Sequence, residues 1–331
     1  MITGNVWDAV GETPLIKIQS LSELTGCEIY GKSEFLNPGG SIKDRAAKGI
    51  IQQAEKDGRL KSGSVIVEGT AGNTGIGLAT LAASRGYKVI ISIPDNQAAE
   101  KYEVLKALGA ELHLVKPCPF SDQNHFYHTA RRIAESTPNG FWANQFENPA
   151  NSRFHYVTTG PEVWNQLSGK IDILTLATGT GGTIGGVSSF LKEKNPKIRV
   201  VLADPMGSGM ATFLKTGEIK SEGSSVTEGI GIMRLTANFK TAKIDDAIQV
   251  DDLKMISMLY HLAKEDGLLL GTSSALNLFS AFQLGMAERG SKKKIVTFLC
   301  DSATRYASRV FNTTWLNEKS LQPRALTSFL S

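Results

Sequence analysis

The chain has 331 residues, of which 41% are hydrophobic and 21% charged, with a formal net charge of +4. These values are typical of a globular protein with one large or two medium domains. The basic residues form no long block apart from Lys292–Lys294, which we interpret as the solvated start of a strand. Composition therefore argues against a nucleic-acid-binding protein.

Two further classes are excluded by the same reasoning. No apolar run approaches the roughly 18 residues that a membrane span needs, and residues 1–12 lack the basic and apolar regions of a signal peptide. The three cysteines form no CxxC motif, which suits a reducing compartment. We expect a cytoplasmic protein with neither nucleic acid nor membrane as a partner.

Short β-branched runs alternate with helical patterns along the chain. Strands are predicted at 65–67, 88–93, 111–115, 171–177, 198–203 and 294–299, and helices at 41–56, 73–84, 98–108, 122–135, 152–166, 183–194, 251–264 and 273–287. This alternation predicts an α/β fold with two open, mostly parallel twisted sheets and flanking helices. A turn-forming stretch at 147–151 suggests a boundary between two domains, with ligands bound in the cleft between them.

The first glycine-rich segment, Asn37-Pro-Gly-Gly-Ser-Ile-Lys-Asp-Arg45, combines a turn with a helix start. Ser41 and Asp44 have the spacing of a capping box, which places Lys43 in the first helical turn. A helix dipole disfavours a cation there. Lys43 therefore either points into solvent or serves as the amine of a Schiff base.

Three further loops follow predicted strands or apolar runs. Residues 68–77 carry Thr70, Gly72, Asn73 and Thr74 at a helix N-terminus, and this arrangement suits a carboxylate or a phosphate. The segment Gly179-Thr-Gly-Gly-Thr-Ile-Gly-Gly186 predicts a phosphate cradle, although it matches neither the dinucleotide fingerprint nor a Walker A loop. In Gly271-Thr-Ser-Ser-Ala275, Ser273 or Ser274 would serve as a helix N-cap if the loop binds no ligand.

In this order and spacing, the loops resemble the β-family of pyridoxal-phosphate enzymes. These are the fold-type II, tryptophan synthase β-like enzymes, and within them the similarity is to cysteine synthases, also called O-acetylserine sulfhydrylases. The similarity extends from Gly11-Glu-Thr-Pro-Leu15 to Asp301-Ser-Ala-Thr-Arg305. It implies an active site in the interdomain cleft, a smaller, mobile domain at 41–148, and a larger domain of 1–40 and 149–331 that carries the phosphate loop.

The resemblance also implies roles for individual residues. Lys43 would form the internal aldimine with pyridoxal 5'-phosphate and remove the α-proton of the substrate. The cofactor phosphate would bind to Gly179, Thr180, Gly181, Gly182 and Thr183, its phenolic oxygen to Asn73, and its pyridine nitrogen to Ser273. The substrate carboxylate would bind to Thr70, Gly72, Asn73, Thr74 and Gln145, beside a glycine-lined wall at Gly229 and Gly231.

The implied reaction is replacement of the acetoxy group of O-acetylserine by sulfide through an aminoacrylate, giving cysteine and acetate. The family also implies a homodimer and a serine acetyltransferase tail as a partner. Alanines at 71 and 275 and Thr272 depart from the usual loops, and the loss of one hydroxyl at Ala71 is worth about 1 kcal/mol of substrate binding. Arg234 and Arg305, both expected near the cleft, keep O-phosphoserine open as a donor.

Other functions stay open at this stage. A cystathionine β-synthase, which joins serine to homocysteine, shares these loops. A serine or threonine dehydratase usually has Ser-Phe-Lys-x-Arg-Gly at the lysine, whereas Asp44-Arg45-Ala46 follows Lys43 here. A non-catalytic sensor of a phosphate ligand is the alternative from a different class. We expect no metal, because His125 and His128 lack a third ligand nearby.

Overall fold

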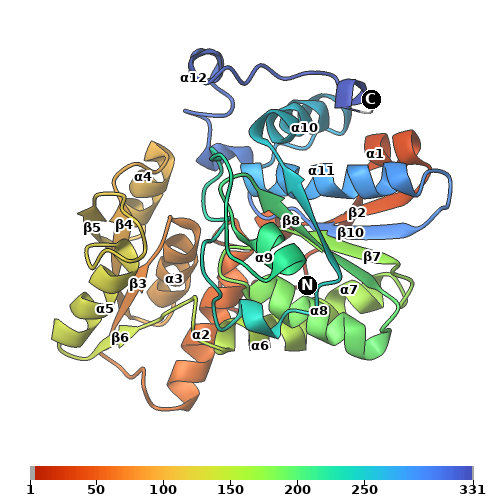
Figure 1. Cartoon of the computed structure of the whole chain (residues 1–331). Coiled ribbons are helices and arrows are strands. Elements are labelled where there is room, and N and C mark those ends of the chain that lie inside the picture. Colours follow the sequence, from red (N-terminus) through yellow and green to blue (C-terminus); the bar gives the residue numbers. More distant parts are fainter. Residues whose placement is uncertain (1–3, 330–331) are drawn as a thin grey trace.

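A computed structural model describes residues 4–329 of the chain, which form two sheets with helices on their faces (Figure 1). We expected no signal peptide in residues 1–12. Residues 1–3 of that segment lie outside the described residues. None of the helices in the described range is both long and apolar enough to cross a bilayer.

The larger sheet has six strands in the order β1-β2-β10-β7-β8-β9. All neighbours pair in parallel except β1 and β2, which are antiparallel. Its strands are β1 (Leu15–Lys17), β2 (Glu28–Lys32), β7 (Ile173–Leu176), β8 (Arg199–Pro205), β9 (Asp246–Val250) and β10 (Lys294–Phe298).

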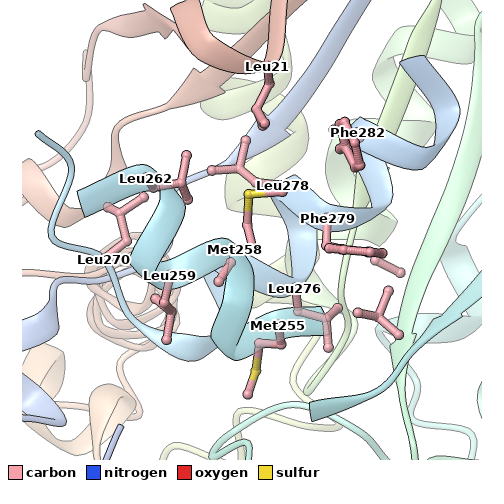
Figure 2. Close-up of a cluster of buried hydrophobic side chains, with 14 of the residues drawn as sticks. Leu21, Met255, Met258, Leu259, Leu262, Leu270, Leu276, Leu278, Phe279 and Phe282 are labelled. Carbon is pink, nitrogen blue, oxygen red and sulfur yellow. The ribbon is translucent and has the colours of Figure 1, made fainter. Parts of the chain in front are cut away.

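Helices cover both faces of this sheet. One face packs against α1 (Gln19–Thr25), α10 (Asp252–Glu265) and α11 (Thr272–Ala287). Figure 2 shows this cluster, in which Met255, Leu259, Leu276 and Phe279 interdigitate. The other face packs against α7 (Gly160–Gln166), α8 (Gly182–Lys194) and α9 (Met210–Thr216). A short helix, α12 (Thr313–Glu318), lies near the C-terminal end.

The smaller sheet is wholly parallel and has four strands in the order β5-β4-β3-β6. These are β3 (Val65–Gly69), β4 (Lys88–Pro94), β5 (Glu111–Val115) and β6 (Gly140–Trp142). One side packs against α2 (Lys43–Lys56), α3 (Asn73–Ala83) and α4 (Ala99–Ala107), and the other against α5 (Phe126–Ser136). The two sheets confirm the predicted fold class.

Several predicted elements were wrong in detail. The strands β1, β2, β6 and β9 were missed. Residues 152–166, predicted as one helix, form α6 (Ala150–Phe154), a π-helical turn (His155–Thr159) and α7. Helix α5 starts at Phe126 instead of residue 122, because the His125 side chain accepts a hydrogen bond from the backbone of Tyr127 as an N-cap.

Candidate active site

A cavity of about 350 Å³ lies between the ends of the two sheets. Its lining includes ten of the residues predicted from sequence for cofactor or substrate binding, namely Lys43, Thr70, Asn73, Thr74, Gln145, Gly179, Thr180, Gly229, Gly231 and Ser273. A smaller adjoining cavity is lined by Lys43, Ser273 and the whole loop from Gly179 to Thr183. Gly72 lines neither cavity and instead lies at the N-cap of α3 with φ +130°.

Lys43 is the first residue of α2, as its position after two glycines predicts. The predicted capping box is wrong, however. Ser41 Oγ accepts from the backbone N–H of Lys43, and Asp44 Oδ2 accepts from Gly39 at 2.5 Å. Asp44 folds back over the turn because Gly39 leaves no side chain in its way. Burial raises the pKa of Asp44 to about 7.

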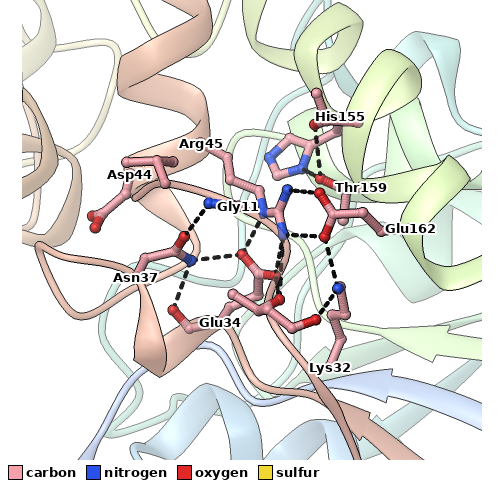
Figure 3. A network of polar contacts seen from close by, with 12 residues as sticks. Gly11, Lys32, Glu34, Asn37, Asp44, Arg45, His155, Thr159 and Glu162 are labelled. Carbon is pink, nitrogen blue, oxygen red and sulfur yellow. Dashed lines mark hydrogen bonds and ion pairs between the residues drawn. The ribbon is translucent and has the colours of Figure 1, made fainter. Parts of the chain in front are cut away.

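At the first turn of α2 lies a buried ionic cluster, which we call the Arg45 network and which comprises Lys32, Glu34, Arg45 and Glu162 (Figure 3). Arg45 makes two-pronged contacts with Glu34 (2.7 and 2.9 Å) and with Glu162 (2.7 and 2.7 Å). Burial disfavours the charge of Glu162, but Arg45 and Lys32 outweigh it and lower its pKa to about 2. Arg45 follows Lys43 by two residues, so the network fixes the first turn of α2 and hence the direction of Lys43.

The loop from Gly179 to Thr183 joins the end of β7 to the first turn of α8. A Cβ at Gly182 would lie 2.0 Å from Asn151 Oδ1, and one at Gly181 (φ +85°) would lie 2.3 Å from the backbone of Phe239. Glycine is therefore required at both positions, and a loop that leads into a helix N-terminus suits a phosphate. The Oγ1 atom of Thr178 is buried without a partner beside this loop.

His155 was not singled out from sequence. Its Nε2 lies 3.2 Å from Thr183 Oγ1 and its Nδ1 lies 2.9 Å from Thr159 Oγ1. Full burial holds the pKa of His155 well below its usual value, so the ring is neutral. A neutral ring bonded to Thr159 can accept from the Thr183 hydroxyl and fix its rotamer.

Asn73, Thr74 and Gln145 face the cavity from the smaller sheet. Thr74 Oγ1 donates to Gln145 Oε1 at 2.5 Å, and Gln145 Nε2 donates to Gly69 O at 3.1 Å. Glu68, which supports Gln145 from behind, is fully buried, and this burial raises its pKa to about 8. The hydroxyl and amide groups are neutral donors engaged within the chain, so a carboxylate bound here would replace one of these contacts.

Ser273 lines both cavities from the first turn of α11. The N-cap of α11 is Gly271 without a side-chain cap, so neither serine takes the capping role. Ser274 Oγ accepts from the backbone of Cys300 at 2.8 Å and donates to the carbonyl of Asp301. Ser274 is thus committed to structure, while the hydroxyl of Ser273 is presented to the cavity.

The residues fit pyridoxal phosphate in their chemistry. The cavities bring together one lysine at a helix start, a glycine cradle for a phosphate, an amide at Asn73 and a hydroxyl at Ser273. A hydroxyl suits the pyridine nitrogen, and an amide N–H suits a phenolic oxygen.

A family model described as "Pyridoxal-phosphate dependent enzyme" matches residues 6–301. The chain belongs to that family. It is similar to cysteine synthase 1 of Neurospora crassa (48% identity, covering 95% of this chain and 84% of the relative). It is also similar to the cysteine synthase of Dictyostelium discoideum (46% identity, 99% and 89%).

Among solved structures, the chain resembles an O-acetylserine-dependent cystathionine β-synthase from Helicobacter pylori. The TM-score is 0.84 at 33% identity, and the match covers 93% of this chain and 98% of the other. Family membership makes this protein a pyridoxal-phosphate-dependent enzyme and confirms the predicted cofactor.

Charged residues at the outer wall of the cavity were missed from sequence. Lys101 of α4 pairs with Glu228, which also accepts from Arg309; we call these three residues the mouth cluster. The side chains of Lys101 and Glu228 are only 2% and 6% exposed. Neither residue belongs to a motif, and only the approach of α4 to the segment before Gly229 brings them together.

Arg234 and Arg305 behave differently from one another. Arg234 lines the cavity, pairs with Glu147, and lies 4.2 Å from the ring centroid of Phe120. Arg305 does not line the cavity, because its guanidinium is engaged by Asn73 and Gly39. Of the two arginines that kept O-phosphoserine open, only Arg234 therefore faces the substrate space.

Proposed function

We propose that this protein is a cysteine synthase that replaces the acetoxy group of O-acetyl-L-serine by sulfide, giving L-cysteine and acetate. One observation carries the proposal: Lys43, Asn73, Gln145, Thr180 and Ser273 line a single cavity. The similarity to relatives named cysteine synthase supports the choice of reaction. When bound, pyridoxal phosphate supplies the electron sink for losing the α-proton and the β-substituent.

The proposed roles rest on the family resemblance and are supported by the residues that line the two cavities. Lys43 binds the cofactor covalently and, when released, takes the α-proton with its amine. The loop from Gly179 to Thr183 holds the phosphate, Asn73 the phenolic oxygen and Ser273 the pyridine nitrogen. A serine hydroxyl does not keep that nitrogen protonated as a carboxylate would, which limits the electron withdrawal and suits prompt loss of a leaving group.

The substrate carboxylate is proposed to bind to Thr70, Gly72, Thr74 and Gln145, with Gly229 opposite. We propose that residues 41–148 form a smaller domain that closes on the larger domain of 1–40 and 149–331. Closure over the carboxylate would exclude water from the reacting atoms. A homodimer, a cytoplasmic location and the docking of a serine acetyltransferase tail are proposed from the family resemblance alone.

The first experiment compares the purified protein with Lys43→Ala after addition of pyridoxal phosphate. We expect a visible absorption band that borohydride bleaches, with the reduced cofactor found on Lys43 by mass spectrometry. Lys56→Ala, in the exposed last turn of the same helix, is the matched control and should keep the band. A Lys43→Ala variant with an unchanged band contradicts the proposed role.

The second experiment compares three substrate pairs: O-acetylserine with sulfide, O-phosphoserine with sulfide, and serine with homocysteine. We expect the first pair to give the largest kcat/KM. The third pair is included because a cystathionine β-synthase of Apis mellifera is 38% identical to this chain. A larger kcat/KM for either rival pair contradicts the proposed reaction.

A further inference from the structure

The turn after β10, residues 300–306, runs under the cavity and contacts the two segments that carry Lys43 and Asn73. The backbone N–H of Ile42 donates to Cys300 O at 2.9 Å, and Ser41 forms an antiparallel bridge with Asp301. Two charged side chains of this turn, Asp301 and Arg305, are 0% and 8% exposed. Buried charges of this kind need partners, and here both have Asn73 as a partner.

Asn73 is held from both ends of its amide. Its Nδ2 donates to Asp301 Oδ2 at 2.6 Å, and its Oδ1 accepts from Arg305 Nη1 at 2.6 Å. Tyr306 donates its hydroxyl to the same Asp301 oxygen at 2.7 Å, which fixes that carboxylate. Because a guanidinium only donates, the amide oxygen must face Arg305 and the amide nitrogen must face Asp301, so these partners permit one orientation of the amide.

This orientation leaves one N–H of Asn73 without a partner among the contacts described, and the residue lines the cavity beside Lys43. The second Nη of Arg305 donates to Gly39 O in the turn before Lys43. A single buried guanidinium therefore connects the Lys43 turn to the Asn73 amide. A cation bonded to the amide oxygen also polarises the amide and makes its N–H a stronger donor.

We propose that Arg305 and Asp301 are positioning residues that orient and polarise the Asn73 amide so that its remaining N–H donates to the phenolic oxygen of pyridoxal phosphate. The inference rests on the proposed role of Asn73. Neither residue touches the cofactor, so their effect passes through Asn73. If they served only to join backbone segments, their loss would not depend on whether Asn73 is present.

The test measures the dissociation constant of pyridoxal phosphate and the ratio of the two tautomeric absorption bands of the lysine-bound cofactor. Arg305→Gln is made in the wild-type chain and in the Asn73→Ala background. We expect Arg305→Gln to weaken cofactor binding roughly tenfold, as for a lost charge-assisted hydrogen bond, and to shift the band ratio. In the Asn73→Ala background the same change should have no further effect.

Two more variants keep the test decisive. Arg309→Gln removes an arginine four residues after Arg305 that pairs with Glu228 and not with Asn73. This variant should leave the band ratio unchanged. Arg305→Lys keeps the positive charge if Arg305→Gln folds poorly, and should fall between the wild type and Gln, because one ammonium cannot reach Asn73 and Gly39 together.

The outcomes separate the inference from the proposed function. If Asn73→Ala changes neither affinity nor band ratio, the proposed contact of Asn73 is wrong. If Asn73→Ala changes both while Arg305→Gln and Arg305→Lys change neither, only the positioning role is overturned. Equal effects of Arg305→Gln in the two backgrounds also overturn it, because the residue then acts independently of Asn73.

Discussion

The Arg45 network and the mouth cluster both join the segment 41–148 to the rest of the chain, the first at the start of α2 and the second at α4. The Arg45 network lies where the chain passes from β2 into α2, and it holds four charges in matched pairs. The mouth cluster lies at the outer wall of the cavity, where one carboxylate serves two cations.

The two sites also differ in the pKa shifts of their central cations, Arg45 and Lys101. In the Arg45 network, the two carboxylates overcome burial and raise the pKa of Arg45 above its usual value, although burial lowers the pKa of Lys32. In the mouth cluster, burial outweighs Glu228 and lowers the pKa of Lys101. Arg45 makes four hydrogen bonds to two carboxylates, whereas Lys101 has one carboxylate partner, so we expect the mouth cluster to be the weaker of the two contacts.

The largest effect on stability should come from removing Arg45, the cation that both carboxylates of the Arg45 network share. Arg45→Met leaves Glu34, which is fully buried, and Glu162 with only Lys32 nearby. We expect the free energy of unfolding to fall by about 3–5 kcal/mol, measured by urea denaturation. Arg199→Met, which breaks a pair with Asp246 that is 43% and 44% exposed, is the control and should cost less than about 1 kcal/mol. A similar loss for both variants contradicts the comparison.

Acid should weaken the Arg45 network in the wild-type chain. The pKa of Glu162 is about 2 in the folded chain, against an ordinary value of 4.5 for a glutamate. A lowered folded pKa gives stability that is fully present above pH 4.5 and is lost as the pH falls towards 2. We expect urea denaturation at a series of pH values to show this loss. In Glu162→Gln, the free energy of unfolding should fall less steeply with pH over the same interval. If the free energy of unfolding depends on pH equally in the variant and the wild type, other carboxylates account for the acid sensitivity.

The sequence predicted the glycine loops and Lys43 because both depend on local order: a strand, a turn and a helix start are adjacent in the chain. It did not predict the Arg45 network, because the partners of Arg45 lie 11 and 117 positions away. The strands β1 and β6 have three residues each, too few to show an alternation. The prediction that Asp44 takes part in a capping box was wrong. Its hydrogen-bond partner is the backbone of Gly39, and no spacing rule specifies the path of the backbone there.

The mouth cluster should give the smallest effect on stability and the most localised one. Glu228→Gln keeps an acceptor for Lys101 but removes the negative charge shared with Arg309. If the domains move as proposed, α4 and the facing loop part and water reaches both cations, so we expect a loss of only about 1–2 kcal/mol. Hydrogen exchange should rise in α4 and around residues 226–230 while the first turn of α2 stays protected. Lys106→Met on the same helix, whose pair with Glu103 is 60% and 72% exposed, should leave exchange unchanged. If Glu228→Gln destabilises the chain as much as Arg45→Met, or exposes α2, the mouth cluster belongs to the fixed part of the fold and the difference between the two sites disappears.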